Sequence, residues 1–314
     1  MKYISLILIA ILLVTGCQAK DVTPEKEKIT VMASLFPQYD FARQVGGDLV
    51  EVTLLLPPGV EAHAYEPTPK EIVAIQESDL FLYTGEHMEP WAHRLIDASD
   101  DIKPVDLSQA ITLIEDDHDH EDHSDEGEAA EDDHDHDHEG VDPHIWTDPQ
   151  NAMRMVGSIR DALIEIAPEH TAAFTDNAAA YLAKLEQLDQ DFAALFEPHD
   201  EIDIFFAGHN AFGYFAKRYD LHFHSPYSGY SPDAEPSPRA ISELMEKMKE
   251  TDSKVVYYEE LIEPKVAEVI RDATGAEMML LNGAHNISKE DLTAGIGYLD
   301  IFRQNLEALR KGLE

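Results

Sequence analysis

A long helical stretch in the middle of the sequence constrains the fold of this chain more than any other feature. The segment "EHTAAFTDNAAAYLAKLEQLDQDFAALF" (169–196) contains neither Gly nor Pro and is long enough for about seven helical turns. A break at Ala167-Pro168 separates it from an earlier helical pattern. We predict a rigid linking helix over residues 169–197.

Strand and helix patterns alternate on both sides of this helix. "KITVMASLF", "VEVTLLLPPG" and "DLFLYTG" read as strands with helices between them, and "IDIFFAG", "SKVVYYEE" and "AEMMLLN" repeat the style later, with helices expected in "HNAFGYFAKRY", "SPRAISELMEKMKE" and "EPKVAEVIRDATG". Such alternation is typical of parallel sheets covered by helices. The expected fold class is α/β with two lobes, 29–168 and 198–314, and a closing helix from Lys289 to about Lys311.

The N-terminus has the pattern of a secreted lipoprotein. Met1-Lys2 precedes an apolar segment, Ile4–Val14, which is too short to span a bilayer comfortably. The following "VTGC" resembles a lipobox, and Cys17 is the single cysteine of the chain. We expect a signal peptide over 1–16, a lipid on Cys17, a polar tether over 17–28, and a protein anchored outside the cytoplasmic membrane.

Charge and histidine gather in one acidic run. The chain carries a formal net charge of −40, which argues against nucleic-acid binding because phosphates would be repelled. Residues 115–140 alternate acids with histidine and lack apolar clusters, so we expect disorder in the absence of metal. The run is either a metal site itself, a metal-gathering accessory or a solvated loop; its histidines are His118, His120, His123, His134, His136 and His138.

Four histidines outside the run are better placed for a site. Ligands of open parallel sheets bind beyond the carboxyl ends of strands. His63, His209 and His285 follow predicted strands, and His144 lies in "VDPHIWTDP" just before the helical region. Four imidazoles match a closed tetrahedral zinc site. The remaining histidines are expected at the surface or in the core: His87, His93, His170, His199, His222 and His224.

Several long motifs occur in the order found in a known family. "GVEAHAYEPTPKEIVAIQESDLFLYTG", "DPHIWTDPQNA", "GHNAFGYFAKRYDL" and "EPSP" resemble the zinc/manganese solute-binding lipoproteins of ABC importers, the cluster A-I family. The resemblance covers the chain from about Lys28. It implies two α/β lobes joined by a long backbone helix, with one metal ion held between the lobes.

The resemblance also implies a ligand set. The first three ligand positions of the family fall on His63, His144 and His209, and histidine at the third position is typical of zinc members. The fourth position, an acid in many members, holds His285 here. Either four imidazoles bind the ion, or Glu61 or water completes the shell. Zinc members often carry a His-rich loop, so we interpret the run 115–140 as an auxiliary metal-gathering loop.

Together with the candidate histidines, the family resemblance implies a monomeric protein that captures Zn²⁺ and delivers it to the permease of an ABC importer. It also implies that the protein has no enzymatic activity. Nitrogen donors favour zinc over manganese without excluding copper, and binding should weaken below roughly pH 6.5. Alternatives are a surface adhesin, a metal buffer, or delivery of manganese or another divalent metal.

A zinc hydrolase with Glu259 or Glu260 as general base is disfavoured, because no HExxH motif occurs and four ligands leave no place for water. Helix capping or lobe-to-lobe hydrogen bonding is the simpler role for these two acids.

Overall fold

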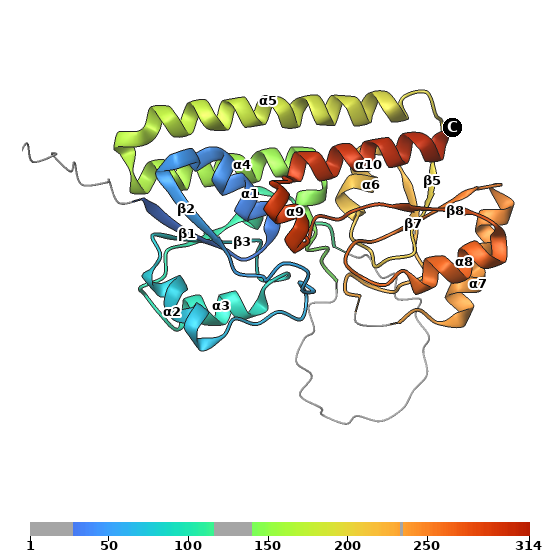
Figure 1. Cartoon of the computed structure of the whole chain (residues 1–314), viewed down its shortest axis with the longest axis horizontal. Helices are drawn as coiled ribbons and strands as arrows, with labels where there is room; N and C mark the ends of the chain where they lie inside the picture. Colours follow the sequence, from blue (N-terminus) through green and yellow to red (C-terminus); the bar gives the residue numbers. More distant parts are fainter. Residues whose placement is uncertain (1–27, 116–139, 233–234) are drawn as a thin grey trace, which may run out of the picture.

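The computed structural model describes residues 28–115, 140–232 and 235–314. Several predicted features lie outside the described residues: the signal peptide, the lipid on Cys17, almost all of the tether, and the six histidines of the acidic run. Within the described part, two lobes built on parallel strands lie side by side beneath a layer of long helices (Figure 1). Glu115 and Val141 form an antiparallel bridge, so the acidic run begins and ends at adjacent points of the fold.

The first lobe is built on a sheet of four parallel strands in the order β2-β1-β3-β4. The inner strand β3 is buried at every position, as expected of a strand covered on both faces. Helix α2 begins with a capping box, in which Thr68 and Glu71 satisfy each other's backbone N–H groups. The elements are β1 (Ile29–Ala33), α1 (Phe36–Gly46), η1 (Gly47–Leu49), β2 (Val50–Leu54), α2 (Pro69–Glu77), β3 (Leu80–Tyr83), α3 (Pro90–Asp97), β4 (Pro104–Asp106) and η2 (Leu107–Ala110).

The second lobe repeats this architecture with two parallel strand pairs, β5-β6 and β7-β8. A parallel bridge between Phe206 and Tyr257 joins the pairs, and the N–H of Ala207 donates to the carbonyl of Tyr257 at 2.8 Å. The elements are β5 (Asp203–Phe205), α6 (Gly213–Tyr219), β6 (His222–His224), α7 (Pro238–Glu250), β7 (Val255–Tyr258), α8 (Lys265–Thr274) and β8 (Glu277–Leu280).

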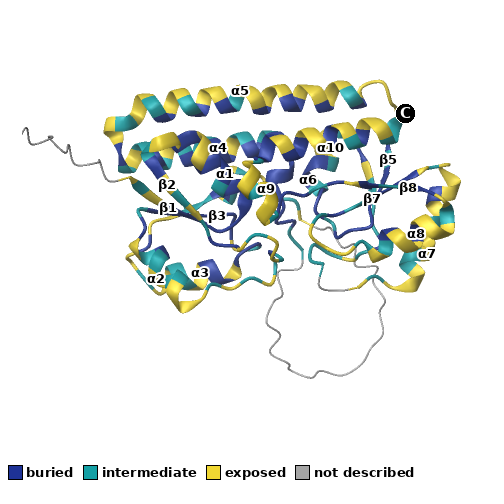
Figure 2. Cartoon of the chain, viewed as in Figure 1, coloured by how far each residue is buried: buried dark blue, intermediate teal, exposed yellow. Residues whose placement is uncertain are grey.

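The helical layer spans both lobes. Helix α5 (Thr171–Phe196) lies over α4 (Pro149–Ile166) and α10 (Tyr298–Leu313), with its outer face exposed (Figures 1 and 2). Its buried residues recur every three or four positions, for example Phe174, Ala178 and Tyr181. One hydrophobic core contains residues of both lobes and of this layer. The predicted α/β fold class with a long linking helix is confirmed, and apolar packing as well as chain connection ties the lobes together.

Two local predictions are wrong, and three short elements are missed. A single closing helix from Lys289 is expected, but α9 (Lys289–Ala294) ends at Gly295, whose positive φ of 77° favours glycine, and α10 begins after Gly297. The helix expected from His209 begins only at Gly213, leaving His209 in a turn. The short elements α3, β4 and β6 are not predicted at all. In the described residues, no helix is both long and apolar enough to span a membrane.

Candidate metal centre

The structure brings the four predicted histidines into one cluster. His63 lies on an irregular segment after β2, and His144 precedes η3 (Ile145–Thr147) and α4. His209 follows β5, and His285 follows β8. The two histidines of the second lobe thus follow the carboxyl ends of parallel strands, where the sequence analysis expects a site, and they lie beside the two of the first lobe.

The spacing of the ring nitrogens suits a tetrahedral ion. Each histidine offers one nitrogen, and these four nitrogens all lie within 4.8 Å of one another. The Nε2 atom of His144 is 3.2 Å from Nε2 of His63 and 3.3 Å from Nε2 of His209. Nitrogens bound to one zinc at 2.0–2.1 Å would be about 3.3 Å apart in a regular tetrahedron. Two nitrogen pairs of the cluster thus already have the spacing of a zinc site, and the remaining pairs lie within 4.8 Å.

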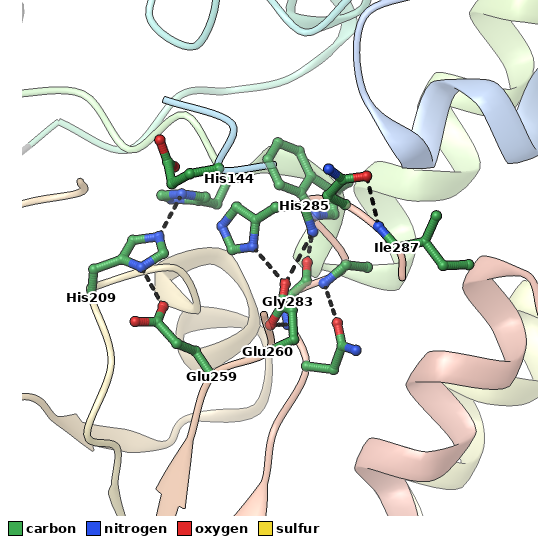
Figure 3. Close-up of polar contacts among 12 residues, drawn as sticks. His144, His209, Glu259, Glu260, Gly283, His285 and Ile287 are labelled. Carbon is green, nitrogen blue, oxygen red and sulfur yellow. Dashed lines mark hydrogen bonds and ion pairs between the residues drawn. The ribbon is translucent and has the colours of Figure 1, made fainter. Parts of the chain in front are cut away.

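Carboxylates orient three of the four rings, as Figure 3 shows for two of them. The Nδ1 atom of His144 is 2.8 Å from Oδ1 of Asp142. The Nδ1 atom of His209 is 2.6 Å from Oε2 of Glu259, and that of His285 is 3.0 Å from Oε1 of Glu260. A carboxylate accepts the Nδ1 proton and leaves Nε2 as the free donor atom, which is the usual arrangement behind metal-bound histidine.

This arrangement leaves facing lone pairs at the centre. When the Nδ1 atoms of His144 and His209 donate to their carboxylates, the neutral rings carry no proton on Nε2. Their 3.3 Å contact then sets two acceptors against each other, which only a cation or a proton between them makes favourable. The Nε2 atom of His285 is also buried and has no hydrogen-bond partner among the described residues. Both observations point to a positively charged occupant.

Burial and neighbouring charge separate the histidines in their affinity for protons. Burial, together with the charge of His285 and His209, lowers the pKa of His63 to about 2, and the pKa of His144 falls well below its usual value for the same reasons. Burial also acts to lower the pKa of His285, but the hydrogen bond and charge of Glu260 raise it above the usual value. The pKa of Glu260 is lowered, because its pairing with His285 outweighs burial. As pH falls, His285 therefore takes up a proton before His63 or His144 does.

Glu61, the alternative ligand, accepts hydrogen bonds within its own turn. Its carboxylate accepts hydrogen bonds from the backbone N–H groups of His63 at 2.8 Å and Ala64 at 2.9 Å, so it stabilises the turn that carries His63. It is not part of the nitrogen cluster. That the four histidines bind the ion stays a prediction, but Glu61 is already occupied by its own loop.

The acidic partners are what the sequence analysis missed. Glu259 and Glu260 are expected to cap a helix or to bridge the lobes, whereas the structure pairs them with His209 and His285. Glu260 also accepts from the backbone N–H of Gly283 at 2.8 Å. The available signal was the pair of acids at the end of a buried strand, because that edge of the sheet carries the site. For Asp142 the available signal was its place only two residues before His144.

The other histidines of the described part lie outside the cluster. His93 is exposed beside Asp97, His170 lies beside Glu169, and the Nε2 atom of His224 is 2.5 Å from Asp203. None of them contributes to a group of metal-ligating side chains within the described ranges. Their prediction as surface or satisfied core residues agrees with this placement.

Known proteins resemble this chain in sequence and in fold. A family model described as "Zinc-uptake complex component A periplasmic" matches residues 31–312. The "High-affinity zinc uptake system protein ZnuA" of Bacillus subtilis is 37% identical over 91% of this chain and 88% of its own length. The "Zinc-binding lipoprotein AdcA" of Streptococcus pneumoniae is 34% identical over 99% of this chain, which spans only 61% of that longer protein.

A solved structure agrees. The Zn(II)-bound ZnuA-like domain of Streptococcus pneumoniae AdcA superimposes with a TM-score of 0.74 at 31% identity, covering 91% of this chain and 99% of that one. Sequence and fold therefore lead to the same assignment. The chain belongs to the family of zinc-uptake complex component A proteins, the solute-binding proteins of zinc import.

Proposed function

We propose that this protein captures one Zn²⁺ ion in the cluster of His63, His144, His209 and His285 and delivers it to the permease of an ABC importer. The observation that carries this proposal is the set of four imidazole nitrogens within 4.8 Å of one another, three of them on rings oriented by carboxylates. The relatives named for zinc uptake support the choice of cargo.

The donor set supports zinc over manganese. Neutral imidazole nitrogens suit zinc, copper and nickel, whereas manganese prefers carboxylate and water oxygens. The carboxylates nearest the cluster are engaged with ring nitrogens or backbone N–H groups. Copper binds such donors at least as strongly as zinc, so selectivity against copper has to come from metal supply or from the permease.

We also propose that the site performs no catalysis. Four protein ligands fill a tetrahedral zinc shell and leave no position for a reactive water. Glu259 and Glu260, the candidates for a general base, hold His209 and His285. The protein acts by binding and release alone.

Processing at the N-terminus would place the site outside the cytoplasmic membrane. The family description as periplasmic and the lipoprotein name of the pneumococcal relative support a lipid anchor on Cys17. We also propose a tether over residues 17–28 and a monomer that works beside its permease. We retain the division into a lobe over 29–168, a linking helix over 169–197 and a lobe over 198–314. The shared hydrophobic core favours small movements of these lobes.

The acidic run would serve the site without forming it. Its ends meet at Glu115 and Val141, three residues before His144. Ions collected by its six histidines would be released close to the cluster. Ligands on an apolar-poor loop should bind several ions weakly, since ordering the loop opposes binding.

Metal counting tests this proposal. A soluble form beginning at Lys20 is stripped of metal, with and without residues 116–139, and titrated with zinc, manganese and copper under native mass spectrometry. The proposal expects one tight zinc in the shortened form, lost on His144→Ala or His209→Ala. Loss of all tight binding on deletion of the run would instead place the site in the run.

Delivery needs a separate test in cells. A strain lacking the protein should grow poorly under zinc limitation, and the intact gene should restore growth whereas the His144→Ala form should not. Full restoration by the variant would favour the adhesin or buffer alternatives over zinc delivery.

A further inference from the structure

His63 is held in the cluster differently from the other three histidines. Carboxylates fix the rings of His144, His209 and His285 through Nδ1, but the carboxylate nearest His63, that of Glu61, accepts from backbone N–H groups instead. His63 is also the least buried of the four. The position of its ring therefore depends on the position of its loop, residues 57–64, which contains no helix or strand.

One buried side chain of the other lobe holds that loop. Asn286, next to His285, is 1% exposed, and its side-chain amide donates to the carbonyl oxygens of both Pro57 and Val60 at 2.7 Å. The backbone N–H of Gly59 adds a bond to the carbonyl of Ile287 at 3.0 Å. Three hydrogen bonds thus join two irregular segments that lie more than 220 residues apart in the sequence.

The segment that carries Asn286 is itself firmly placed. The Nε1–H of Trp146 donates to the carbonyl of Gly283 at 2.7 Å, and Glu260 accepts from the N–H of Gly283. Ala284 adopts a positive φ of 57°, a conformation that alanine holds only where its surroundings fix it. Figure 3 shows Glu260, Gly283 and His285 together at this turn. Asn286 is therefore a donor on a rigid support, reaching to a loop without regular structure.

We propose that Asn286 is a positioning residue that clasps the His63 loop and so completes the four-histidine centre from across the lobes. The inference rests on the proposed capture of zinc by this centre. These hydrogen bonds link the loop of His63 to the segment that carries His285. Moving the two segments apart would therefore break the hydrogen bonds of the Asn286 amide and withdraw His63 from the ion. Loss of the clasp should chiefly speed release of the metal, because changes within one binding site act mostly on dissociation.

Two substitutions remove the donor in different ways. Asn286→Asp keeps the shape and the oxygen that accepts from the N–H of Ile287, but places an oxygen against the carbonyls of Pro57 and Val60. Asn286→Ala removes the amide without adding a charge. Asn177→Ala is the matched control, because its amide also donates to a distant backbone carbonyl, that of Val45, away from the cluster.

The experiment measures zinc affinity by chelator competition and zinc release by stopped flow, each in the native and in the His63→Ala background. Asn286→Asp and Asn286→Ala should weaken zinc binding about tenfold, the effect of one or two net hydrogen bonds, and mostly through faster release. In the His63→Ala background the same changes should cost less than about twofold, since no ring remains to be positioned. Asn177→Ala should leave affinity unchanged in both backgrounds, with circular dichroism confirming the fold of each variant.

A general loss of structure would weaken binding equally in both backgrounds and would overturn the inference. Unchanged affinity and release in Asn286→Asp and Asn286→Ala, with His63→Ala still weakening zinc binding, would overturn the clasp while leaving the proposed function intact. If His63→Ala itself had no effect, His63 would not be a ligand, and both the ligand set and the clasp would fail.

Discussion

The metal centre has two unequal parts. On one side, His144, His209 and His285 are buried and each ring is oriented by a carboxylate; on the other, His63 is half-buried and depends on a loop. The rings of His144, His209 and His285 are held in place as in a preformed site, whereas the ring of His63 can move with its loop. If the four histidines bind the ion as proposed, this difference would let one protein hold an ion tightly and also give it up, with three ligands defining the site and His63 governing release.

The largest effect should come from removing a ligand of the rigid side. Structural zinc binds with about 10–16 kcal/mol, so one of four ligands accounts for roughly 3 kcal/mol, or on the order of 100-fold to 1000-fold in affinity. His144→Ala should reach the upper end and His63→Ala should fall below it, because His63 is the least buried of the four and water can replace its ring more easily. Chelator competition measures both, with the exposed His93→Ala as control. A loss in His63→Ala as large as that in His144→Ala would remove the distinction between the two sides.

Removing an orienting carboxylate should have the next largest effect. Glu259→Gln and Glu260→Gln should each weaken zinc binding about 10- to 100-fold, the usual range for partners behind metal ligands. Glu61→Gln should be milder, since an amide oxygen still accepts one of the two backbone N–H bonds. Isothermal titration or chelator competition gives the values. Equal losses for Glu61 and Glu260 would mean that His63 is oriented as strictly as the other rings.

The pH dependence should follow the rigid side. A raised pKa lets His285 keep its proton to higher pH, so protons compete with zinc there before they reach His63, whose pKa is about 2. Affinity should fall as pH drops through the pKa of His285. Because Glu260 raises that pKa, Glu260→Gln should move the fall to lower pH, whereas His63→Ala should move it little. Chelator competition between about pH 5 and 8 tests this, and an unshifted profile in Glu260→Gln would contradict the assignment.

The smallest effect concerns the indole between the rings. Trp146 stands edge-on to His144 and His285, with ring centroids 5.5 and 5.4 Å away, and donates to Gly283. Trp146→Phe should weaken zinc binding only about threefold, the effect of one neutral hydrogen bond. It should also abolish the change in tryptophan fluorescence on zinc binding, which Trp91→Phe should preserve. Persistence of the signal in Trp146→Phe would place the conformational response elsewhere.

How far the sequence leads is clearest at this centre. The strand patterns and the rule for parallel sheets predict three of the histidines, and the long segment without Gly or Pro predicts the linking helix. The carboxylate behind each ring is harder to foresee, because the pairing of His209 with Glu259 depends on how β5 and β7 align across 50 residues. The same holds for the amide of Asn286, whose partners lie over 220 residues away.

Short elements are hidden for a different reason. The strands β4 and β6 span three residues each, too few for an alternating pattern to be recognised. The break between α9 and α10 depends on Gly295 and on Gly297, where a Cβ would come within 3.1 Å of the carboxylate of Asp40. A tertiary contact of this kind leaves no periodic signal in the sequence.

The central claim is that four imidazoles, and no carboxylate, hold one zinc ion. Crystals of the soluble form lacking residues 116–139, loaded with one equivalent of zinc, would be measured on both sides of the zinc absorption edge. We expect a single anomalous peak about 2.0–2.1 Å from a ring nitrogen of each of His63, His144, His209 and His285. A peak bound by Glu61, or one lying outside this cluster, would contradict the account.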